Sequence, residues 1–420
     1  MVSRVAARLV AGSPAIAAAH FRAEADPYDP ATNPGGYVNL GTAESRLVWD
    51  LLAPRLAAAR PRTAADVRYG HLHGTDELRG AVAALLARAW RTPVAADDLV
   101  VVSGATAALD IVASVLCDPG EVIVVPAPYY SGLDVDLAGR SGARLIPVQM
   151  PGPDGGRLNP AVLDRALGRL RRAGVAVRAV AVTSPSNPQG HVHTAAMLRE
   201  LLRVAQAHDV DVIADEIYAH SVFGPERFVS VRDPAVLGGV PGADPGRVHV
   251  VWGFAKDFGL PGLKVGVLHS SGPRVRAAAR ALAYFAPAST DTQVLLVDLL
   301  ADSDWLRRFR TESTARLAAS RRAAGDLLTR LGLGYVPPAA GFSLWVDLRG
   351  CLPGPGFAAE RLLWERLFDA ARLNILPGAV FSAPEPGWFR LCHAVDPALV
   401  REGAARLARV LSAAAPGMSA

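Results

Sequence analysis

Three features of the 420-residue sequence predict an α/β fold with a mostly parallel sheet. Seven short β-branched apolar runs alternate with longer Ala-, Leu- and Arg-rich stretches between about residues 98 and 270. The runs are almost continuously apolar, which is typical of strands that helices cover on both faces. After Pro287 long helical stretches lead to one apolar strand and a closing helix, which predicts a smaller α+β domain. The seven runs are DLVVVSG, EVIVVPA, ARLIPVQ, VRAVAVTSP, VDVIADE, VHVVWGF and LKVGVLHS.

Three segments follow from this pattern. We expect residues 1–60 to form an N-terminal arm and part of the small domain, 61–305 the large domain, and 306–420 the C-terminal small domain. The 51% hydrophobic composition is sufficient for a sizeable core. The first twenty residues faintly resemble a targeting peptide, but they contain no long apolar region, so we favour an arm that packs on a partner subunit.

Composition argues against several classes of partner. The 44 basic and 39 acidic side chains are scattered and form no dense basic block with interleaved aromatics, which disfavours nucleic-acid binding. No uninterrupted apolar run is long enough to span a membrane. The three cysteines are far apart and the close histidine pairs lack a third ligand, so we expect no metal site. This sparse cysteine content fits a cytoplasmic protein.

The segment SGATAALD at 103–110 predicts a phosphate-binding turn. A strand ends here, Gly104 and Ala105 allow close backbone approach, and a helix begins whose first amides are free to bind an anion. Thr106 could add a hydroxyl donor. Turns of this kind are common in α/β proteins, so the segment alone does not identify a site.

Polar side chains follow the next strands. Asn187 in SPSNPQG and Asp215 in ADEIY each end an apolar strand, and Tyr218 follows three residues after Asp215. Because ligands of such sheets bind at the carboxyl ends of strands, these side chains are expected at one site. A buried carboxylate is costly without a cationic partner, and a protonated pyridine nitrogen would be such a partner. Taken alone, Asn187 could simply stabilise the turn, and Asp215 could form a structural ion pair.

Three cations complete the candidate site. Lys256 follows an apolar strand in VVWGFAKDFGLPGLKVG, and apolar surroundings with a second cation, Lys264, should lower its pKa and make it nucleophilic. Arg390 lies in the apolar stretch EPGWFRLCH. An arginine can hold a carboxylate through a bidentate, charge-assisted pair, which suits the α-carboxylate of an amino acid.

The order and spacing of these motifs resemble fold-type I pyridoxal 5′-phosphate (PLP) enzymes of the aminotransferase class I/II family. The chain is most similar to 1-aminocyclopropane-1-carboxylate (ACC) synthases, from about residue 27 to about 397. The resemblance implies an aspartate-aminotransferase-like fold with a seven-stranded sheet, PLP as cofactor, and a homodimer with shared active sites. It rests on DPATNPGGYVNLGTAESRL, SGATAALD, VPAPYYSGLDVDLAGRSG, SPSNPQG, ADEIYAHSVF, AKDFGLPGLKVG, GFSLWVDL and EPGWFRLC.

The resemblance also implies roles for the catalytic residues. Lys256 would carry PLP as a Schiff base and later move the α-proton of the substrate. Asp215 would pair with the pyridinium nitrogen, while Asn187 and Tyr218 would hydrogen-bond the phenolic oxygen of the ring. Tyr129 would stack on the ring face.

Further roles concern the phosphate and the substrate. Gly104, Ala105, Thr106 and Lys264 would contact the phosphate, and Arg390 would bind the substrate carboxylate. Tyr69 has the aminotransferase spacing for a tyrosine that reaches the phosphate of the neighbouring subunit. Glu44 matches a glutamate that lies near the substrate in ACC synthases.

The chain departs from its relatives mainly around the phosphate. Relatives usually have two serines before the Schiff-base lysine, where this chain has Gly253 and Ala255, and an arginine where it has Lys264. Leu72 and Ser45 replace the usual tyrosine and asparagine of ACC synthases. Two hydroxyl donors are missing, and a bidentate guanidinium has become a point charge.

The implied substrate is S-adenosyl-L-methionine (SAM). Removal of the α-proton and loss of methylthioadenosine from Cγ would lead either to ACC by cyclisation or to γ-substitution or annulation with a second substrate. The spacing of Tyr69 favours an ordinary aminotransferase instead. A β-eliminating amino-acid cyclase and a ligand-sensing domain are weaker alternatives.

Overall fold

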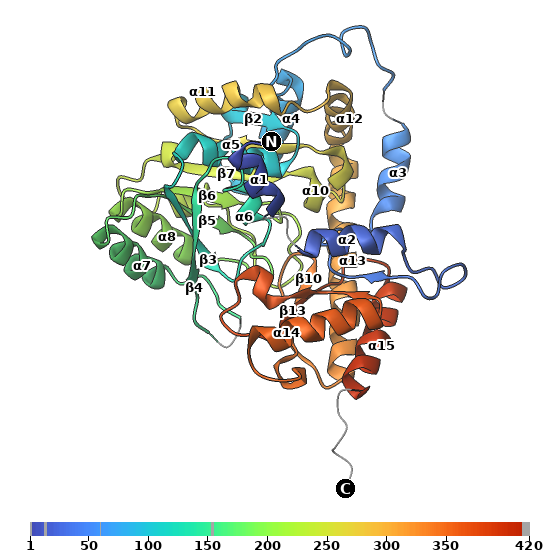
Figure 1. Cartoon of the computed structure of the whole chain (residues 1–420). Coiled ribbons are helices and arrows are strands. Elements are labelled where there is room, and N and C mark those ends of the chain that lie inside the picture. The colour runs from blue at the N-terminus through green and yellow to red at the C-terminus, as the bar shows by residue number, and fades with distance from the viewer. Residues whose placement is uncertain (1, 12–14, 59, 153–154, 414–420) are drawn as a thin grey trace.

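The computed structural model describes residues 2–11, 15–58, 60–152 and 155–413, and a seven-stranded sheet forms its centre (Figure 1). The strand order is β2-β8-β7-β6-β5-β3-β4, and only β8 runs antiparallel to its neighbours. All seven predicted apolar runs are strands of this sheet, so the prediction is confirmed. They are β2 (Leu99–Val102), β3 (Val122–Ala127), β4 (Arg144–Gln149), β5 (Val177–Thr183), β6 (Asp211–Asp215), β7 (Val248–Gly253) and β8 (Gly266–His269).

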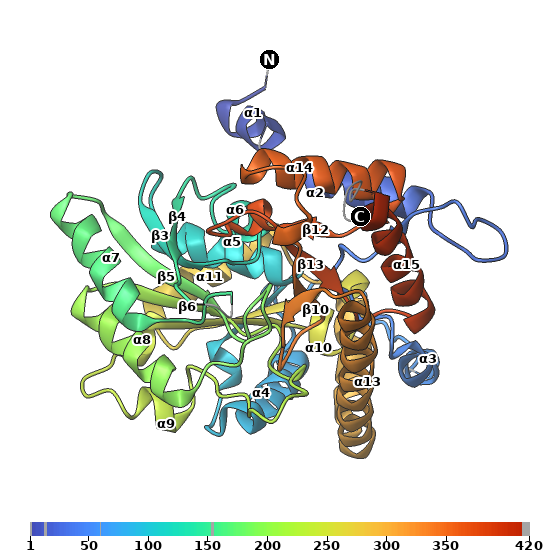
Figure 2. The same cartoon turned by 90° about the horizontal axis from the view of Figure 1, so that it is seen from below.

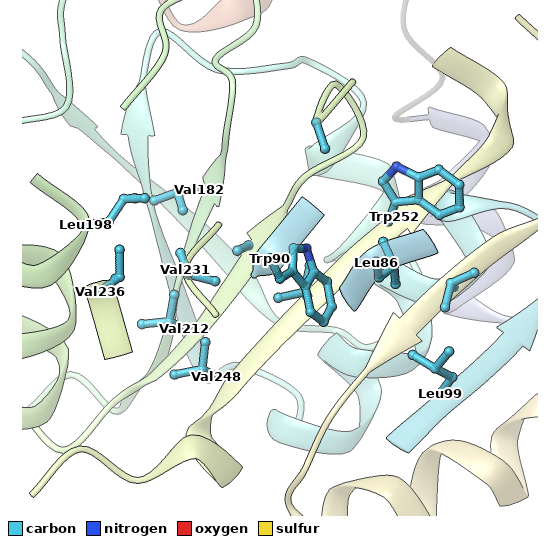
Figure 3. Close-up of a cluster of buried hydrophobic side chains, with 14 of the residues drawn as sticks. Leu86, Trp90, Leu99, Val182, Leu198, Val212, Val231, Val236, Val248 and Trp252 are labelled. Carbon is cyan, nitrogen blue, oxygen red and sulfur yellow. The ribbon is translucent and has the colours of Figure 1, made fainter. Parts of the chain in front are cut away.

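Helices cover both faces of this sheet. Alternate residues of β3 enter two different apolar clusters: Val124 packs in one, and Ile123 and Val125 in the other. This two-faced burial explains why the strands are continuously apolar. Figure 3 shows part of the first cluster, which includes Leu86 and Trp90 of α4 and Trp252 of β7. The covering helices are α4 (Asp76–Trp90), α7 (Pro160–Arg172), α8 (Ala195–Ala207) and α12 (Thr290–Ala301) on the first face, and α5 (Ala105–Leu116) and α11 (Pro273–Leu282) on the second.

A smaller antiparallel sheet lies beside the large one (Figure 2). Its strand order is β12-β13-β10-β9, and its apolar core is separate from the two clusters of the large sheet. Helix α13 (Ser303–Arg330) connects the two parts, because it contributes Phe309 to the large core and Leu317 to the small one. The strands are β9 (Gly334–Val336), β10 (Ser343–Asp347), β12 (Leu376–Pro377) and β13 (Trp388–Cys392), and the remaining helices are α14 (Gly356–Glu365) and α15 (Pro397–Ala413).

The N-terminal segment packs against the smaller part. Strand β1 (Val38–Asn39) pairs in parallel with β11 (Leu373–Asn374), and Ala19 and Ala23 of α2 (Ala15–Ala25) pack against Tyr37 and Phe368. The predicted boundaries at residues 60 and 305 remain predictions, since α13 runs through the second one. The other helices are α1 (Arg4–Ala11), α3 (Trp49–Ala57), α6 (Leu133–Asp136), α9 (Pro234–Leu237) and α10 (Phe254–Asp257).

The described residues contain neither a candidate membrane-spanning helix nor a candidate metal cluster. No helix within them is both long and apolar enough to cross a membrane. Likewise, no three His, Cys, Asp or Glu side chains of the described ranges come together in a way that could hold a metal ion.

Candidate active site

A cavity of about 430 Å³ lies where the large sheet meets the smaller part. Strands β5, β6 and β7 point their carboxyl ends at it, and α2, β12 and β13 contribute to its opposite side. Residues predicted from motifs far apart in the sequence therefore share one site, as expected for a sheet of this type. Those that line the cavity are Gly104, Ala105, Thr106, Asn187, Asp215, Tyr218, Lys256, Lys264 and Arg390.

Lys256 is held in the cavity by the short helix α10, which begins directly after β7. Its Nζ donates a hydrogen bond to the carbonyl oxygen of Ala43 at 2.6 Å. Burial and the nearby Arg390 guanidinium lower the pKa of Lys256 to about 8. We expected Lys264 to be the second cation, but the structure gives that role to Arg390. Lys256 is therefore more often a neutral, nucleophilic amine near neutral pH than an exposed lysine would be.

Asp215 is buried at the last position of β6. One oxygen accepts a hydrogen bond from the backbone N–H of Ile217 at 3.3 Å, and no cation of the described ranges forms a salt bridge with it. Burial raises the pKa of this carboxyl to about 7. A buried acid without a partner is costly, so the site suits a ligand that brings its own positive charge. The protonated ring nitrogen of PLP meets that requirement.

Arg390 lies in the middle of the small sheet, on β13, and its side chain is buried. Nη1 donates to Oδ1 of Asn187 at 3.1 Å and Nη2 to the carbonyl oxygen of Gly41 at 2.6 Å, while Nε has no partner. The guanidinium also stacks on Phe381, with Cζ 4.9 Å from the ring centroid. No carboxylate of the described residues pairs with it. A buried guanidinium in this state suits an anionic ligand such as a carboxylate.

The opposite end of the cavity is formed by the start of α5. Gly104 precedes the helix with a φ of 101°, which favours glycine, and Ala105 and Thr106, the first residues of the helix, line the cavity. Strand β8 passes directly beneath, since a Cβ on Gly266 would lie 2.2 Å from the Gly104 carbonyl carbon. Lys264 supplies the positive charge at this end. These groups fit a phosphate, which is the anion that PLP would bring.

The missing serines of the phosphate site have different structural contexts. A Cβ on Gly253 would lie 2.9 Å from the carbonyl oxygen of Val265, so this position has no space for a serine. Ala255 lines the cavity, and a hydroxyl on its Cβ would be close to the ligand. Only one of the two departures from the relatives therefore follows from packing.

The predicted stacking residue lies outside this cavity. The Tyr129 hydroxyl donates to Oδ1 of Asp134 at 2.8 Å, and the side chain borders a separate small pocket. Its neighbour Tyr130 lines the main cavity instead, where it interacts electrostatically with Asp215 and Arg390. The prediction for Tyr129 is therefore wrong in its position by one residue, and Tyr130 is the aromatic side chain available to a ring.

Two further predicted residues do not line the cavity. The Glu44 carboxylate lies 3.5 Å from Nη2 of Arg46, although the preceding residues 41–43 do line the cavity. Tyr69 is fully exposed and does not reach the cavity of its own chain. The roles of Glu44 near the substrate and of Tyr69 across a dimer remain predictions.

Sequence reasoning missed several residues of the cavity wall. His20 of α2 bonds through Nδ1 with the Thr42 hydroxyl at 2.7 Å, and Asn374 donates to Asn39 at 2.9 Å. Asp136 lines the phosphate end beside Thr106. His20 and Asn374 lie outside every stretch on which the resemblance rests, whereas Asp136 lies within VPAPYYSGLDVDLAGRSG, where no role was predicted for it.

Comparisons with known proteins agree with this geometry. Residues 36–407 match the family model of aminotransferase class I and II. ACC synthase 2 of Oryza sativa subsp. japonica is 35% identical over 383 residues, which cover 88% of this chain and 79% of that protein. ACC synthase 6 of Arabidopsis thaliana is also 35% identical, with 88% and 77% covered. Aspartate aminotransferase from Thermus thermophilus with maleate superposes with a TM-score of 0.80 at 25% identity, over 98% of this chain and 99% of that one.

These findings establish the fold and the cofactor. The fold is aspartate-aminotransferase-like, as the resemblance implied. ACC synthases and aminotransferases of this family use PLP, which agrees with the buried acid without a salt bridge, the guanidinium without a carboxylate partner and the helix N-terminus of the cavity. The chain belongs to the aminotransferase class I and II family of PLP-dependent enzymes.

Proposed function

We propose that the protein acts on SAM, removing its α-proton and releasing methylthioadenosine from Cγ. The observation that supports this most strongly is that Lys256 and Arg390 line the same cavity. The chain is also similar to ACC synthases over 88% of its length. A free amine and an unpaired guanidinium are the two groups needed to hold an amino acid and move its α-proton.

Arg390 would set the orientation of the substrate. Its free Nε and the donors now bound to Asn187 and Gly41 can form a bidentate pair with the α-carboxylate. Binding there would hold Cα close to the Lys256 amine, which lies near the Arg390 guanidinium. The amine can then accept the α-proton as a general base, since burial has lowered its pKa to about 8.

When bound, PLP stabilises the negative charge that develops at Cα. The chain supports that chemistry through Asp215, which would keep the ring nitrogen protonated, and through Tyr130, which would cover the ring face. Asn187 and Tyr218, which also line the cavity, would donate hydrogen bonds to the ring oxygen. A sulfonium at Cγ is a good leaving group, so proton removal in this site favours loss of methylthioadenosine.

An amino-acid aminotransferase is the second candidate. Solved structures of aspartate aminotransferases superpose over nearly the whole chain, and Tyr69 has the aminotransferase spacing. In that case Lys256 would return the proton to the cofactor and a keto acid would leave.

One experiment separates the two reactions. Purified holoprotein is incubated with SAM, and methylthioadenosine and amino-acid products are measured by mass spectrometry. We expect methylthioadenosine in excess over enzyme, with ACC or a γ-substituted amino acid. Absence of methylthioadenosine, together with keto-acid formation from an amino donor, would reject the proposal in favour of transamination. Lys256→Ala is the control, since neither product should form without the amine.

We also propose a homodimer with shared active sites. Tyr69 and Val67 are exposed on a segment that makes no contact with the cavity of its own chain, as expected for residues that a second subunit covers. Light scattering should give twice the mass of 44.0 kDa, and Tyr69→Phe should retain the dimer but release PLP more readily.

A further inference from the structure

Asp136 is a buried carboxylate at the phosphate end of the cavity. It is the last residue of α6, its relative exposure is 8%, and it lines the cavity together with Thr106 and Lys264. The Thr106 hydroxyl donates a hydrogen bond to it. An acid in this place is unexpected, since a phosphate would have to bind beside it.

The charges that face Asp136 do not cancel the repulsion of a second anion. Lys264 is the cation that acts on it, whereas Asp110 of α5 and Asp215 of β6 are both acidic. Asp110 is already paired with Arg140, at 3.1 Å. Tyr130 also faces this carboxyl and is neutral. Lys264 and an ionised Asp136 together give no net formal charge, so this pair would not attract a dianionic phosphate, and the positive potential would come from the amides of α5.

The two positions at which relatives usually have serines supply no hydroxyl donor at this end, where Ser103 and Ser131 also line the cavity. Gly253 and Ala255 have none, and the Thr106 hydroxyl is directed to Asp136. A protonated Asp136 carboxyl would remove the negative charge beside the phosphate and would also supply an O–H donor.

We propose that Asp136 is a cofactor-binding residue that shares one proton with the phosphate of PLP. The proton comes from solvent when the cofactor binds, and it lies between a carboxyl oxygen and a phosphate oxygen. No covalent bond is made or broken. Burial already raises the pKa of Asp136 to about 6 before any phosphate is present, and an adjacent anion raises it further.

This inference rests on the cofactor and not on SAM as substrate. It predicts that the affinity for PLP decreases as the pH rises. Above about pH 6 both the free carboxyl and the free phosphate ester are ionised, so binding takes up one proton. The Kd for PLP should then increase about tenfold for each pH unit. Asparagine at position 136 removes the carboxyl and its proton uptake.

The test compares wild-type apoprotein with Asp136→Asn at pH 6, 7 and 8. The Kd for PLP is measured by absorbance titration without substrate, so the result does not depend on which reaction the enzyme catalyses. The ratio of the wild-type Kd to the variant Kd is used, because Lys256 and Asp215 titrate in both proteins. We expect this ratio to rise about tenfold from pH 7 to pH 8.

Two controls isolate the phosphate. Pyridoxal lacks it, so the ratio measured with pyridoxal should not change with pH. Asp134→Asn alters another acid of the same helix, whose partner is Tyr129, and should bind PLP with the pH dependence of the wild type. Weaker binding by Asp136→Asn at every pH, or a ratio independent of pH, would overturn the proposal and leave Asp136 as a residue that only positions Thr106.

A second measurement does not require the variant to fold. The ³¹P chemical shift of PLP bound to the wild-type protein reports the protonation of its phosphate directly. We expect a resonance between those of the monoanion and the dianion at pH 7.5. A fully dianionic resonance at that pH, with no proton uptake on binding, would contradict the shared proton.

Discussion

The two ends of the cavity differ in how closely they follow the relatives. At the ring and carboxylate end, Lys256, Asp215 and Arg390 lie together, and each buried charge lacks the partner that an amino acid joined to PLP would supply. At the phosphate end Gly253, Ala255 and Lys264 stand where relatives usually have two serines and an arginine. The difference suggests that the reacting groups have been kept while the anchoring of the cofactor has changed.

The largest expected effect is at the ring end. Lys256→Ala should reduce kcat by about 10³-fold or more, since it removes both the covalent attachment and the general base. The visible absorbance of the lysine-bound cofactor should disappear in the same variant. Activity within tenfold of the wild type would show that another group moves the proton.

Asp215→Asn should have the next largest effect on catalysis. Without a negative charge, the ring nitrogen loses the partner that keeps it protonated, and kcat should fall about 10²- to 10³-fold while PLP remains bound. The measurement is steady-state turnover with PLP content determined in parallel. Loss of PLP with unchanged kcat per bound cofactor would assign Asp215 to binding alone.

Arg390→Lys tests the carboxylate clamp. A lysine keeps the charge but cannot form the bidentate pair, so KM for the amino-acid substrate should rise about 10- to 100-fold with a smaller change in kcat. The ratio of effects on KM and kcat is the readout. A change confined to kcat would place the substrate carboxylate elsewhere in the cavity.

The smallest effects concern the phosphate end, where one substitution should strengthen the binding of PLP. Ala255→Ser adds a hydroxyl in the cavity and should lower the Kd for PLP by up to about tenfold. Gly253→Ser is the matched contrast, because its Cβ would lie 2.9 Å from the Val265 carbonyl oxygen, and it should lower Tm without improving the Kd. Equal gains from both serines would show that packing at Gly253 is not limiting.

Much of the fold could be predicted because the strands are buried on both faces. The runs around Ile123, Val124 and Val125 are apolar without interruption, since alternate residues enter different cores. The positions of Asn187 and Asp215 followed from the same pattern, because the carboxyl ends of parallel strands meet at one edge.

The rest depended on details that spacing does not encode. Two adjacent tyrosines follow β3, and only the turn geometry decides that Tyr130 rather than Tyr129 faces the cavity. His20 comes from a helix without any motif, and it reaches the cavity only because α2 packs against Tyr37 and Phe368. Asp136 was missed because it belongs to a short helix whose place beside α5 is set by tertiary packing.

The most direct test of the account is chemical reduction of the holoprotein followed by peptide mass spectrometry. Borohydride should fix a phosphopyridoxyl group to a single lysine, and the modified peptide should contain Lys256. An unmodified Lys256, with the group on Lys264 or on no lysine, would contradict the assignment of the cavity as the site of catalysis.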